Sequence, residues 1–393
     1  MAHNAPMPIL DRIAAFHDDM VAWRHCLHRH PETAYLEHRT SDFVAERLES
    51  FGIPIERGIA GTGLVGTLRR GDGPAIGLRA DMDALPILEA NGFDHASRAP
   101  GRMHACGHDG HTAMLLGGAR YLAETLDFRG TVHFIFQPAE EGEAGGRRMI
   151  EEGLFDRFPV DRVFGMHNWP GMPVGTIGVR PGPMMASSDS WEMIVRGKGG
   201  HAAMPHECVD PVVVAAQIVT ALQTIVSRNL HPVDAGVVSV TQIHAGDAFN
   251  VIPASVVLRG TARAFQPATR DHVERRMGEI AQGIALSGGC TVAFDYDRRY
   301  PATVNWPEEA AIAADIAERV VGAANVDRDP RPTMGGEDFA FMLEARPGAY
   351  LFIGNGPSDE GRVLHSPHYD FNDALLPIGA SYWATLVERL LPA

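Results

Sequence analysis

The sequence predicts an α/β protein in which a mostly parallel sheet carries helices on both faces and an α+β domain is inserted into it. Strand and helix signals alternate from the N-terminus to about residue 180, which is typical of such a sheet. The order then changes to β-α-β-β-α-β, the ferredoxin-like split motif. The 393 residues also exceed the size at which a single core usually stops growing, so two domains are expected.

In the first segment, helical spacing over residues 21–30 breaks at Pro31, and a helix is expected over residues 40–51 because Thr40 and Ser41 can cap it and Gly52 follows it. The turn GDGP separates the next two strands. The elements expected after the second helix are strands 62–70 and 75–82, helix 109–126, strand 131–137, helix 145–155 and strand 160–167.

The stretch RPGPMMAS at residues 180–187 separates this segment from the inserted domain. Within that domain we expect strand 189–197, helix 210–228, strands 235–245 and 255–265, helix 269–288 and strand 290–297. Helix 307–323 and strand 348–354 resume the α/β pattern, and this last segment is too short for a domain of its own. We therefore predict a discontinuous α/β domain (1–186 and 298–393) with an inserted domain (187–297).

Composition excludes several classes of protein. The net charge of −15 and a single lysine, Lys198, leave no basic stripe for nucleic acid. We find no run of about 18 apolar residues that would span a membrane, and residues 1–19 lack the pattern of a signal peptide. The four cysteines are too dispersed for a disulfide framework. A soluble, cytoplasmic protein that binds neither nucleic acid nor membranes is expected.

The stretch HACGHDGH at residues 104–111 is the first candidate for chemistry. Cys106 and His108 lie in a glycine-flanked loop before a helix, where a thiolate and an imidazole can bind one metal ion. Alternatively, Cys106 is a nucleophile and His108 its base, or the loop is simply packed. His104 and His111 are expected to be structural.

Further candidates follow the ends of other predicted strands, where sites form in open α/β sheets. Glu140 and Glu141 can divide two tasks, because one carboxylate can bind a cation while the other takes a proton from water. His167 ends the next strand, and either His365 or His368 can complete the cluster.

Two aspartates, Asp81 and Asp83, end an earlier strand at the same edge. A carboxylate behind a ligating histidine fixes its tautomer, which makes Asp83 a candidate partner of such a histidine, although helix capping is the alternative for both residues. Together, a thiolate, several histidines and a glutamate pair favour a site for one or two metal ions over a cysteine nucleophile, which needs no glutamates.

These stretches resemble the M20 metallopeptidase family, and within it the amidohydrolase branch of hippurate hydrolases, N-acyl-amino-acid amidohydrolases and auxin-conjugate hydrolases. The similarity runs in the family's order from about residue 20 to the C-terminus, and many motifs in register are far more specific than any one of them. The matching stretches are RADMDALP, MHACGHDGHTAMLLG, FIFQPAEEG, GMHNWPG, VRGKGGHAAMPH, NVIP, GGEDFAF and LHSPHYDFND.

The resemblance implies a role for each candidate residue. It makes Glu140 the general base, and we count Asp83 with it among the catalytic residues. It selects His365 over His368, and the implied metal ligands are Cys106, His108, Glu141, His167 and His365. One or two divalent ions per subunit are implied, and zinc, manganese, cobalt or nickel suits such a ligand set. Elsewhere in the family an aspartate stands at the position of Cys106 and an H-x-D at Asp81-Met82-Asp83.

The resemblance also identifies the inserted domain as a lid and dimerisation domain, and thus implies a homodimer or homotetramer. Related lids contribute a histidine, an asparagine and an arginine to the substrate, often across a dimer interface; the matching residues are His201, Asn250 and Arg263. An arginine fork suits a substrate carboxylate, and imidazole or amide donors suit an oxyanion.

The predicted function is therefore that of a metal-dependent amidohydrolase. It would cleave the amide bond of N-acyl amino acids, hippurate-like or auxin-conjugate-like, to a carboxylic acid and a free amino acid. One alternative is a metallo-dipeptidase or aminopeptidase, which needs a group that recognises a free α-amine. The other is a non-catalytic metal-binding protein on the same fold, for which a missing ligand or glutamate would be evidence.

Overall fold

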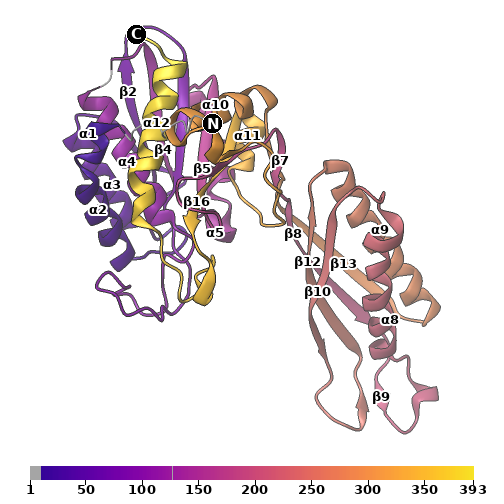
Figure 1. The fold of residues 1–393 in the computed structure, drawn as a ribbon. Helices are drawn as coiled ribbons and strands as arrows, with labels where there is room; N and C mark the ends of the chain where they lie inside the picture. Colours follow the sequence, from indigo (N-terminus) through magenta and orange to yellow (C-terminus); the bar gives the residue numbers. More distant parts are fainter. Residues whose placement is uncertain (1–9, 126) are drawn as a thin grey trace. The chain divides into compact units, whose positions relative to one another are not determined.

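The computed structural model describes residues 10–125 and 127–393 (Figure 1). Residues 1–9, which belong to the segment where we expect no signal peptide, and Leu126, at the end of a predicted helix, lie outside this part. The chain divides into two compact units, which we call the main unit (1–184, 304–331 and 338–393) and the inserted unit (185–303 and 332–337). The inserted unit exceeds the predicted 187–297, and it includes 332–337 because Met185 forms a parallel bridge with Thr333.

An eight-stranded mixed sheet forms the centre of the main unit. From edge to edge, its strands are β1 (Ile55–Ile59), β2 (Gly63–Arg70), β4 (Gly130–Gln137), β3 (Ala75–Asp81), β5 (Arg162–Pro170), β16 (Gly348–Gly356), β6 (Ile177–Gly178) and β15 (Val326–Asp327). The four central strands, β4, β3, β5 and β16, are mutually parallel, whereas β2 and β6 pair with them in the antiparallel sense. Their carboxyl ends therefore meet at one edge of the sheet.

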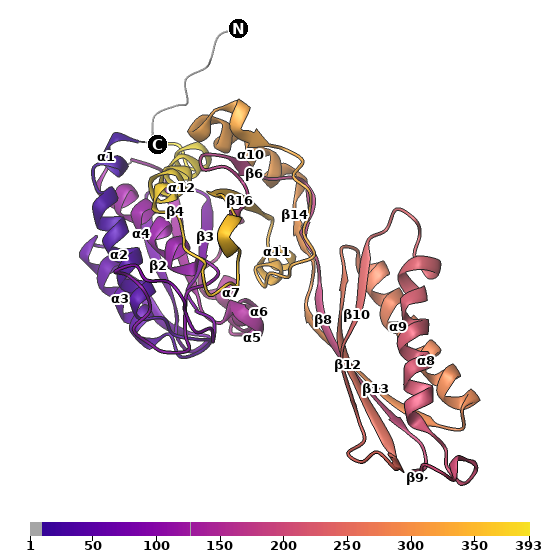
Figure 2. The ribbon, with the colours of Figure 1, turned by 60° about the horizontal axis from the view of Figure 1, so that its bottom comes forward.

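Helices cover both faces of this sheet, as predicted (Figures 1 and 2). Leu78 of β3 points into the core on one face, whereas the next residue, Arg79, lies against Phe339 on the other. The first face carries α1 (Asp11–Ala14), α2 (His17–Arg29), α3 (His38–Ser50), α4 (His108–Glu124), α10 (Pro307–Val321) and α12 (Leu376–Leu390). The second carries α6 (Gly145–Glu151), α7 (Leu154–Arg157) and α11 (Ala340–Ala345).

Two of these elements differ from the sequence prediction. The single helix expected over residues 145–155 is two helices, α6 and α7, because Gly153 adopts a φ of 81° and ends the first one. Helix α12, which the sequence reading did not identify, packs beside α4 over the sheet.

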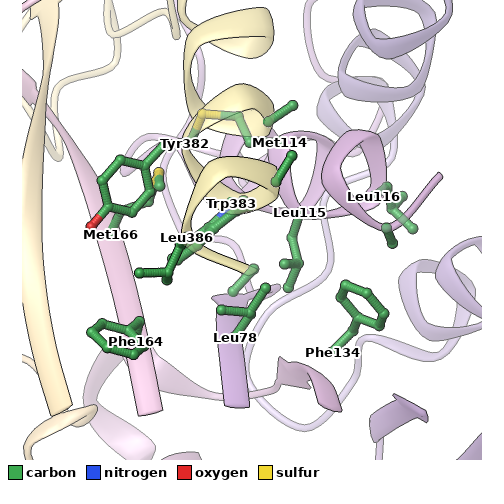
Figure 3. Packing of buried hydrophobic residues seen from close by; sticks show 14 of the residues in the cluster. Leu78, Met114, Leu115, Leu116, Phe134, Phe164, Met166, Tyr382, Trp383 and Leu386 are labelled. Carbon is green, nitrogen blue, oxygen red and sulfur yellow. The ribbon is translucent and has the colours of Figure 1, made fainter. Parts of the chain in front are cut away.

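The main hydrophobic core lies between the sheet, α4 and α12. Figure 3 shows Leu115 of α4 and Trp383 of α12 above Leu78 and Phe134 of the sheet, and none of these side chains is more than 1% exposed. Gly379 allows the close approach of the two helices, since a Cβ atom there would overlap Sδ of Met114. The apolar side chains buried in this core hold α4 against the sheet. The start of α4 is thereby fixed at the carboxyl ends of the central strands.

The inserted unit has the predicted β-α-β-β-α-β order. Its elements are β8 (Ser188–Arg196), α8 (Pro211–Thr224), β10 (Gly236–Ala245), β12 (Ser255–Ala264), α9 (Pro267–Ser287) and β13 (Thr291–Tyr300). They form a four-stranded antiparallel sheet in the order β10-β12-β8-β13. Two further short strands, β9 (Gly200–His201) and β11 (Val251–Ile252), pair with each other. The remaining short strands are β7 (Gly182–Met185) and β14 (Thr303–Asn305).

One helix of the inserted unit corrects the expectation that no stretch of the chain is long and apolar enough to span a membrane. Helix α8 continues into the π-helical turn η2 (Ile225–Asn229), and Pro211–Asn229, with a mean hydropathy of 1.3, is long and apolar enough to cross a membrane by length and composition. A single such helix is weak evidence for a membrane span, because helices of soluble proteins pass the same test. Its Ile218 and Leu222 are buried against the four-stranded sheet, whereas Val213 is 55% exposed.

Candidate active site

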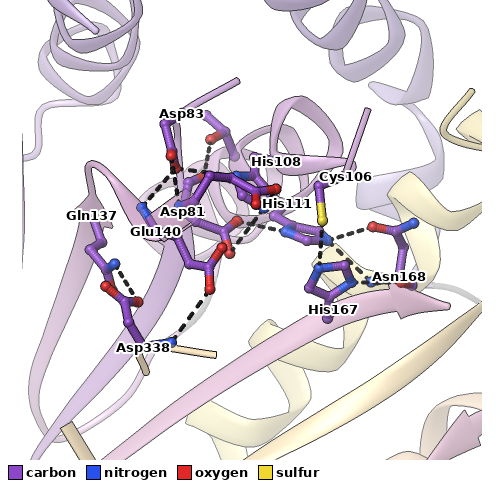
Figure 4. A network of polar contacts seen from close by, with 12 residues as sticks. Asp81, Asp83, Cys106, His108, His111, Gln137, Glu140, His167, Asn168 and Asp338 are labelled. Atoms are coloured by element: carbon purple, nitrogen blue, oxygen red, sulfur yellow. Dashed lines mark hydrogen bonds and ion pairs between the residues drawn. The ribbon is translucent and has the colours of Figure 1, made fainter. Parts of the chain in front are cut away.

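All five predicted metal ligands meet at the carboxyl ends of the central strands. They fall into two groups that share Cys106, one with His108 and His167 and one with Glu141 and His365, and within each group the ligand atoms lie within 4.8 Å of one another. Cys106 Sγ is 3.3 Å from His167 Nε2, and His365 Nε2 is 3.2 Å from Glu141 Oε1. Figure 4 shows the Cys106 thiol directed at the ring of His167, with His108 and Glu140 drawn nearby.

The donor set fits a divalent cation. Nε2 of His108 is fully buried and makes no hydrogen bond within the described part of the chain, although carboxylate oxygens of Asp81 and Glu141 lie 3.8 Å and 3.9 Å away. A buried nitrogen without a partner costs about 1–3 kcal/mol. A cation held between this nitrogen, a thiolate and a carboxylate removes that cost, and thiolate, imidazole and carboxylate are common ligands of zinc-like ions.

The charges around the site favour a cation over a cysteine nucleophile. Burial acts to lower the pKa of His108, but the Asp81, Asp83 and Glu141 carboxylates raise it to about 10. Burial, together with the Glu141 and Glu140 carboxylates, holds the pKa of the Cys106 thiol well above its usual value. A nucleophilic cysteine needs the opposite shift. Burial keeps the pKa of His167 well below its ordinary value, which leaves the neutral imidazole that a metal requires.

The loop that carries Cys106 depends on the glycine next to it. Gly107 has a φ of 100°, and a Cβ atom there would overlap Oδ1 of Asn168 and lie 2.6 Å from the Tyr369 hydroxyl. This close approach allows α4 to begin at His108, directly after Cys106. His365 is anchored to the same loop, since its backbone N–H donates to the carbonyl of Ala105 (2.7 Å).

Buried carboxylates hold the segment that carries Glu140 and Glu141. The Asp83 carboxylate accepts from the backbone N–H groups of both glutamates, at 3.0 Å and 2.9 Å, and lies 3.3 Å from Nδ1 of His108. Asp83 thus lies behind a candidate ligand, as the sequence suggested. Glu37 accepts from the backbone N–H of Ala139 (2.9 Å), which adopts a φ of 56°. These contacts position the Glu140 carboxyl group, which is 7% exposed.

Sequence reasoning missed three participants. Glu37 lies in an irregular stretch whose pattern gives no sign of burial, yet its side chain is inaccessible. The side-chain amide of Asn168 donates to the hydroxyl of Tyr369. Each residue directly follows a candidate histidine, His167 or His368, and nothing in the sequence indicates a role of its own. The spacing of His111 could have indicated its place: it follows His108 by three residues on one helix, so the two side chains lie on the same face.

The predicted substrate residues lie in the inserted unit. His201 of β9 pairs with Val251, and the N–H of Ala202 donates to the carbonyl of Asn250 (3.0 Å), so His201 and Asn250 share one end of the unit and both are exposed. Arg263 belongs to the far end of β12 and is half-buried. Its Nη1 is buried without a hydrogen-bond partner among the described residues.

Comparisons with known proteins agree with this geometry. The sequence model of the family described as peptidase family M20/M25/M40 matches residues 77–389. A hippurate hydrolase of Campylobacter jejuni is 40% identical over 98% of this chain and 100% of its own length. The IAA-amino acid hydrolase ILR1-like 4 of Arabidopsis thaliana is 38% identical over 96% of this chain and 86% of its own. The solved structure of the Bacillus subtilis YXEP protein, described as a dinuclear metal-binding peptidase of the M20 family, matches with a TM-score of 0.84 and 37% identity, covering 96% of this chain and 99% of its own.

Replacing Gly107 with alanine is expected to abolish metal binding. The new Cβ atom would overlap Asn168 and displace the loop between two ligands, at a cost of about 3 kcal/mol or more in stability. Gly101→Ala is the matched control, because Gly101 also has a positive φ (79°) but has nothing within 4 Å of the new atom. Metal content after dialysis and urea unfolding measure both effects. Equal metal binding by the two variants would contradict this account.

Glu37 should make stability fall as the pH rises. Burial raises its pKa to about 7, so the folded chain holds a proton that the unfolded chain, with a pKa of 4.5, has released. Raising the pH from 5 to 8 should therefore lower the free energy of unfolding of wild type by about 2–3 kcal/mol relative to Glu37→Gln. Urea unfolding of the metal-free proteins tests this. Glu46→Gln, on the exposed side of α3, should follow wild type, and parallel curves for wild type and Glu37→Gln would refute the assignment.

Proposed function

The chain belongs to the peptidase family M20/M25/M40, in its amidohydrolase branch, and from this premise we propose that it hydrolyses the amide bond of N-acyl amino acids. The observation that carries the proposal is the full-length similarity to a hippurate hydrolase and an IAA-amino acid hydrolase. Both names describe an acyl group joined to an amino acid through an amide. The products would be a carboxylic acid and a free amino acid. Hippurate-like and auxin-conjugate-like substrates are the two candidates, and we propose a cytoplasmic location.

The proposed mechanism uses the glutamate pair. Cys106, His108, Glu141, His167 and His365 would hold the metal, which when bound supplies Lewis-acid chemistry that polarises a carbonyl oxygen and acidifies water. Glu140 is the general base: it takes a proton from the attacking water and later delivers it to the leaving nitrogen. Its support is geometric, because Asp83 fixes its backbone and its carboxyl group borders the ligand cluster.

The inserted unit would bind the substrate itself. We assign Arg263 to the substrate carboxylate, since its Nη1 is a buried donor without a partner in the described chain and a guanidinium suits a carboxylate. His201 and Asn250 are assigned to the oxyanion of the tetrahedral intermediate.

Distances within the inserted unit support a substrate site to which two copies of the chain contribute residues. Asn250 precedes the start of β12 and Arg263 lies near its end, so roughly 25 Å of strand separates them. One N-acyl amino acid cannot reach both. We therefore propose a homodimer or homotetramer in which His201 and Asn250 act on the partner's substrate. Edge strand β10 and the exposed Ile243 and Val213 offer a surface for such pairing.

A panel of substrates tests the reaction. Purified protein loaded with zinc, manganese or cobalt is expected to release amino acid from benzoyl-glycine, indoleacetyl-aspartate or N-acetyl amino acids, and a chelator should stop the release. Free dipeptides should remain intact. Cleavage of dipeptides alone would favour the peptidase alternative, and no turnover with any metal would favour a binding protein.

Two inactive variants test both the base and the shared site. Glu140→Gln should keep its metal and lose nearly all turnover, because the amide cannot accept the proton. His201→Ala should also be nearly inactive. If His201 acts across the interface, refolding the two variants together should restore about a quarter of wild-type activity, since half of the dimers then carry one competent site of two. Substantial activity in metal-loaded Glu140→Gln would remove Glu140 from the mechanism, and failure to complement would place His201 on its own chain's substrate.

A further inference from the structure

Behind the ligand cluster lies a second set of buried polar side chains that no step above uses. Asp81, His111, Asn168 and Tyr369 are each at most 1% exposed and contact one another in this order, and Figure 4 shows the first three. We propose that these four residues form a positioning chain that fixes the metal ligands without binding the metal, so that metal affinity depends on residues that never touch it. This inference rests on the proposed ligand set and is independent of the substrate.

The polar atoms of Asp81 and His111 are already occupied. One oxygen of Asp81 accepts from Nη1 of the buried Arg79 (2.7 Å), and the other accepts from Nδ1 of His111 (2.6 Å). Nε2 of His111 accepts from the backbone N–H of Asn168 (3.1 Å) and lies 2.7 Å from the side-chain oxygen Oδ1 of the same residue. Both oxygens of the aspartate and both nitrogens of the imidazole are thus engaged within the protein.

This occupancy matters because Asp81, His108 and His111 otherwise satisfy the spacing of a metal site, with ligand atoms within 4.8 Å of one another. The guanidinium of Arg79 places a positive charge on the Asp81 carboxylate, in a region where neither side chain is exposed. A cation at that point would compete with this guanidinium for the Asp81 carboxylate and would break a buried ion pair, while the guanidinium kept only its contacts with Asp338 (3.1 Å) and Gln137 (2.9 Å), which is unfavourable. We therefore assign Asp81 and His111 to positioning and leave His108 as the ligand of that group.

The chain reaches the ligand-bearing segments on either side of it. The backbone carbonyl of Asn168 accepts from Nδ1 of His167 (2.6 Å), which fixes the tautomer of that histidine and directs Nε2 toward Cys106. At its other end, the Asn168 amide donates to the Tyr369 hydroxyl (2.6 Å), and Tyr369 belongs to the loop that carries His365. Strand β3, helix α4, strand β5 and the C-terminal loop are thereby tied together at one point.

Removing one hydrogen bond of the positioning chain should weaken metal binding although every metal ligand is kept. Replacing a side chain that orients a metal ligand from behind commonly lowers metal affinity by about 10- to 100-fold. Tyr369→Phe removes a single hydroxyl from the end of the chain. Tyr382→Phe is its matched control, because Tyr382 is equally buried and its hydroxyl also makes a hydrogen bond, to the carbonyl of Ala313 (3.3 Å). Tyr382 belongs to α12 and lies in the hydrophobic core.

The experiment is a chelator competition for Zn²⁺ with the full-length protein, together with the absorption spectrum of the Co²⁺ form. Tyr369→Phe is expected to bind metal about 10-fold or more weakly and to shift the thiolate–Co²⁺ and d–d bands. Tyr382→Phe should match wild type in both, even if the two variants lose similar thermal stability as metal-free proteins. Asn168→Ala keeps the carbonyl that holds His167 but breaks the chain. Adding Tyr369→Phe to it should cause little further loss, as expected for residues in one network.

Three results would overturn the proposal. Wild-type affinity and spectrum in both Tyr369→Phe and Asn168→Ala would show that the chain does not position the ligands. An equal loss of affinity in Tyr382→Phe would mean that general destabilisation accounts for the effect. Wild-type protein that binds no metal in the same titration would remove the ligand assignment and this inference together, whereas failure to cleave N-acyl amino acids would leave the inference standing.

Discussion

Desolvated negative charge at the carboxyl ends of the central strands is the constraint on which the rest of the structure depends. Asp81, Asp83 and Glu140 are nearly inaccessible, and Glu141 lies among them. Buried carboxylates persist only where positive charge or hydrogen-bond donors compensate them. Three of them are compensated in different ways: Arg79 pairs with Asp81, backbone N–H groups donate to Asp83, and His365 faces Glu141. A divalent cation completes this balance, and its site is defined by the charge that the protein's own groups leave uncompensated.

The same fold contains a second buried charge cluster, in which positive and negative side chains pair with one another. Asp109, next to His108 in sequence, accepts from Nδ1 of His28 (2.8 Å), and Arg24 pairs with Asp370 (2.8 Å). Burial opposes protonation of His28, but Asp109 and Glu89 raise its pKa to about 9, so that this histidine is a cation at neutral pH. Buried charge alone therefore does not mark a metal site in this protein.

The sequence predicts the fold class and the candidate ligands because both follow from local pattern. Strand ends are visible as apolar runs, and Glu140, Glu141 and His167 directly follow or end such runs. What it does not predict depends on spatial proximity between distant segments. The contact of Asn168 with Tyr369 spans 201 residues, and the break between α6 and α7 depends on one glycine. Helix α12 was missed although Pro377 in its first turn and Asn372 in the turn before it are start signals; its own cap residue, Leu375, offers no side-chain hydrogen bond.

The presence of cysteine at position 106 has a physical consequence for how this centre assembles. Burial and the neighbouring carboxylates hold the pKa of the thiol well above its usual value, so the metal-free protein carries a neutral thiol there. Only the thiolate binds a metal strongly, and a divalent ion is the group that can overcome this shift. Metal binding and deprotonation of Cys106 are therefore one coupled event, and because Cys106 belongs to both ligand groups, neither group is complete before it occurs. The cysteine thus makes occupancy of the site depend on proton release as well as on metal supply.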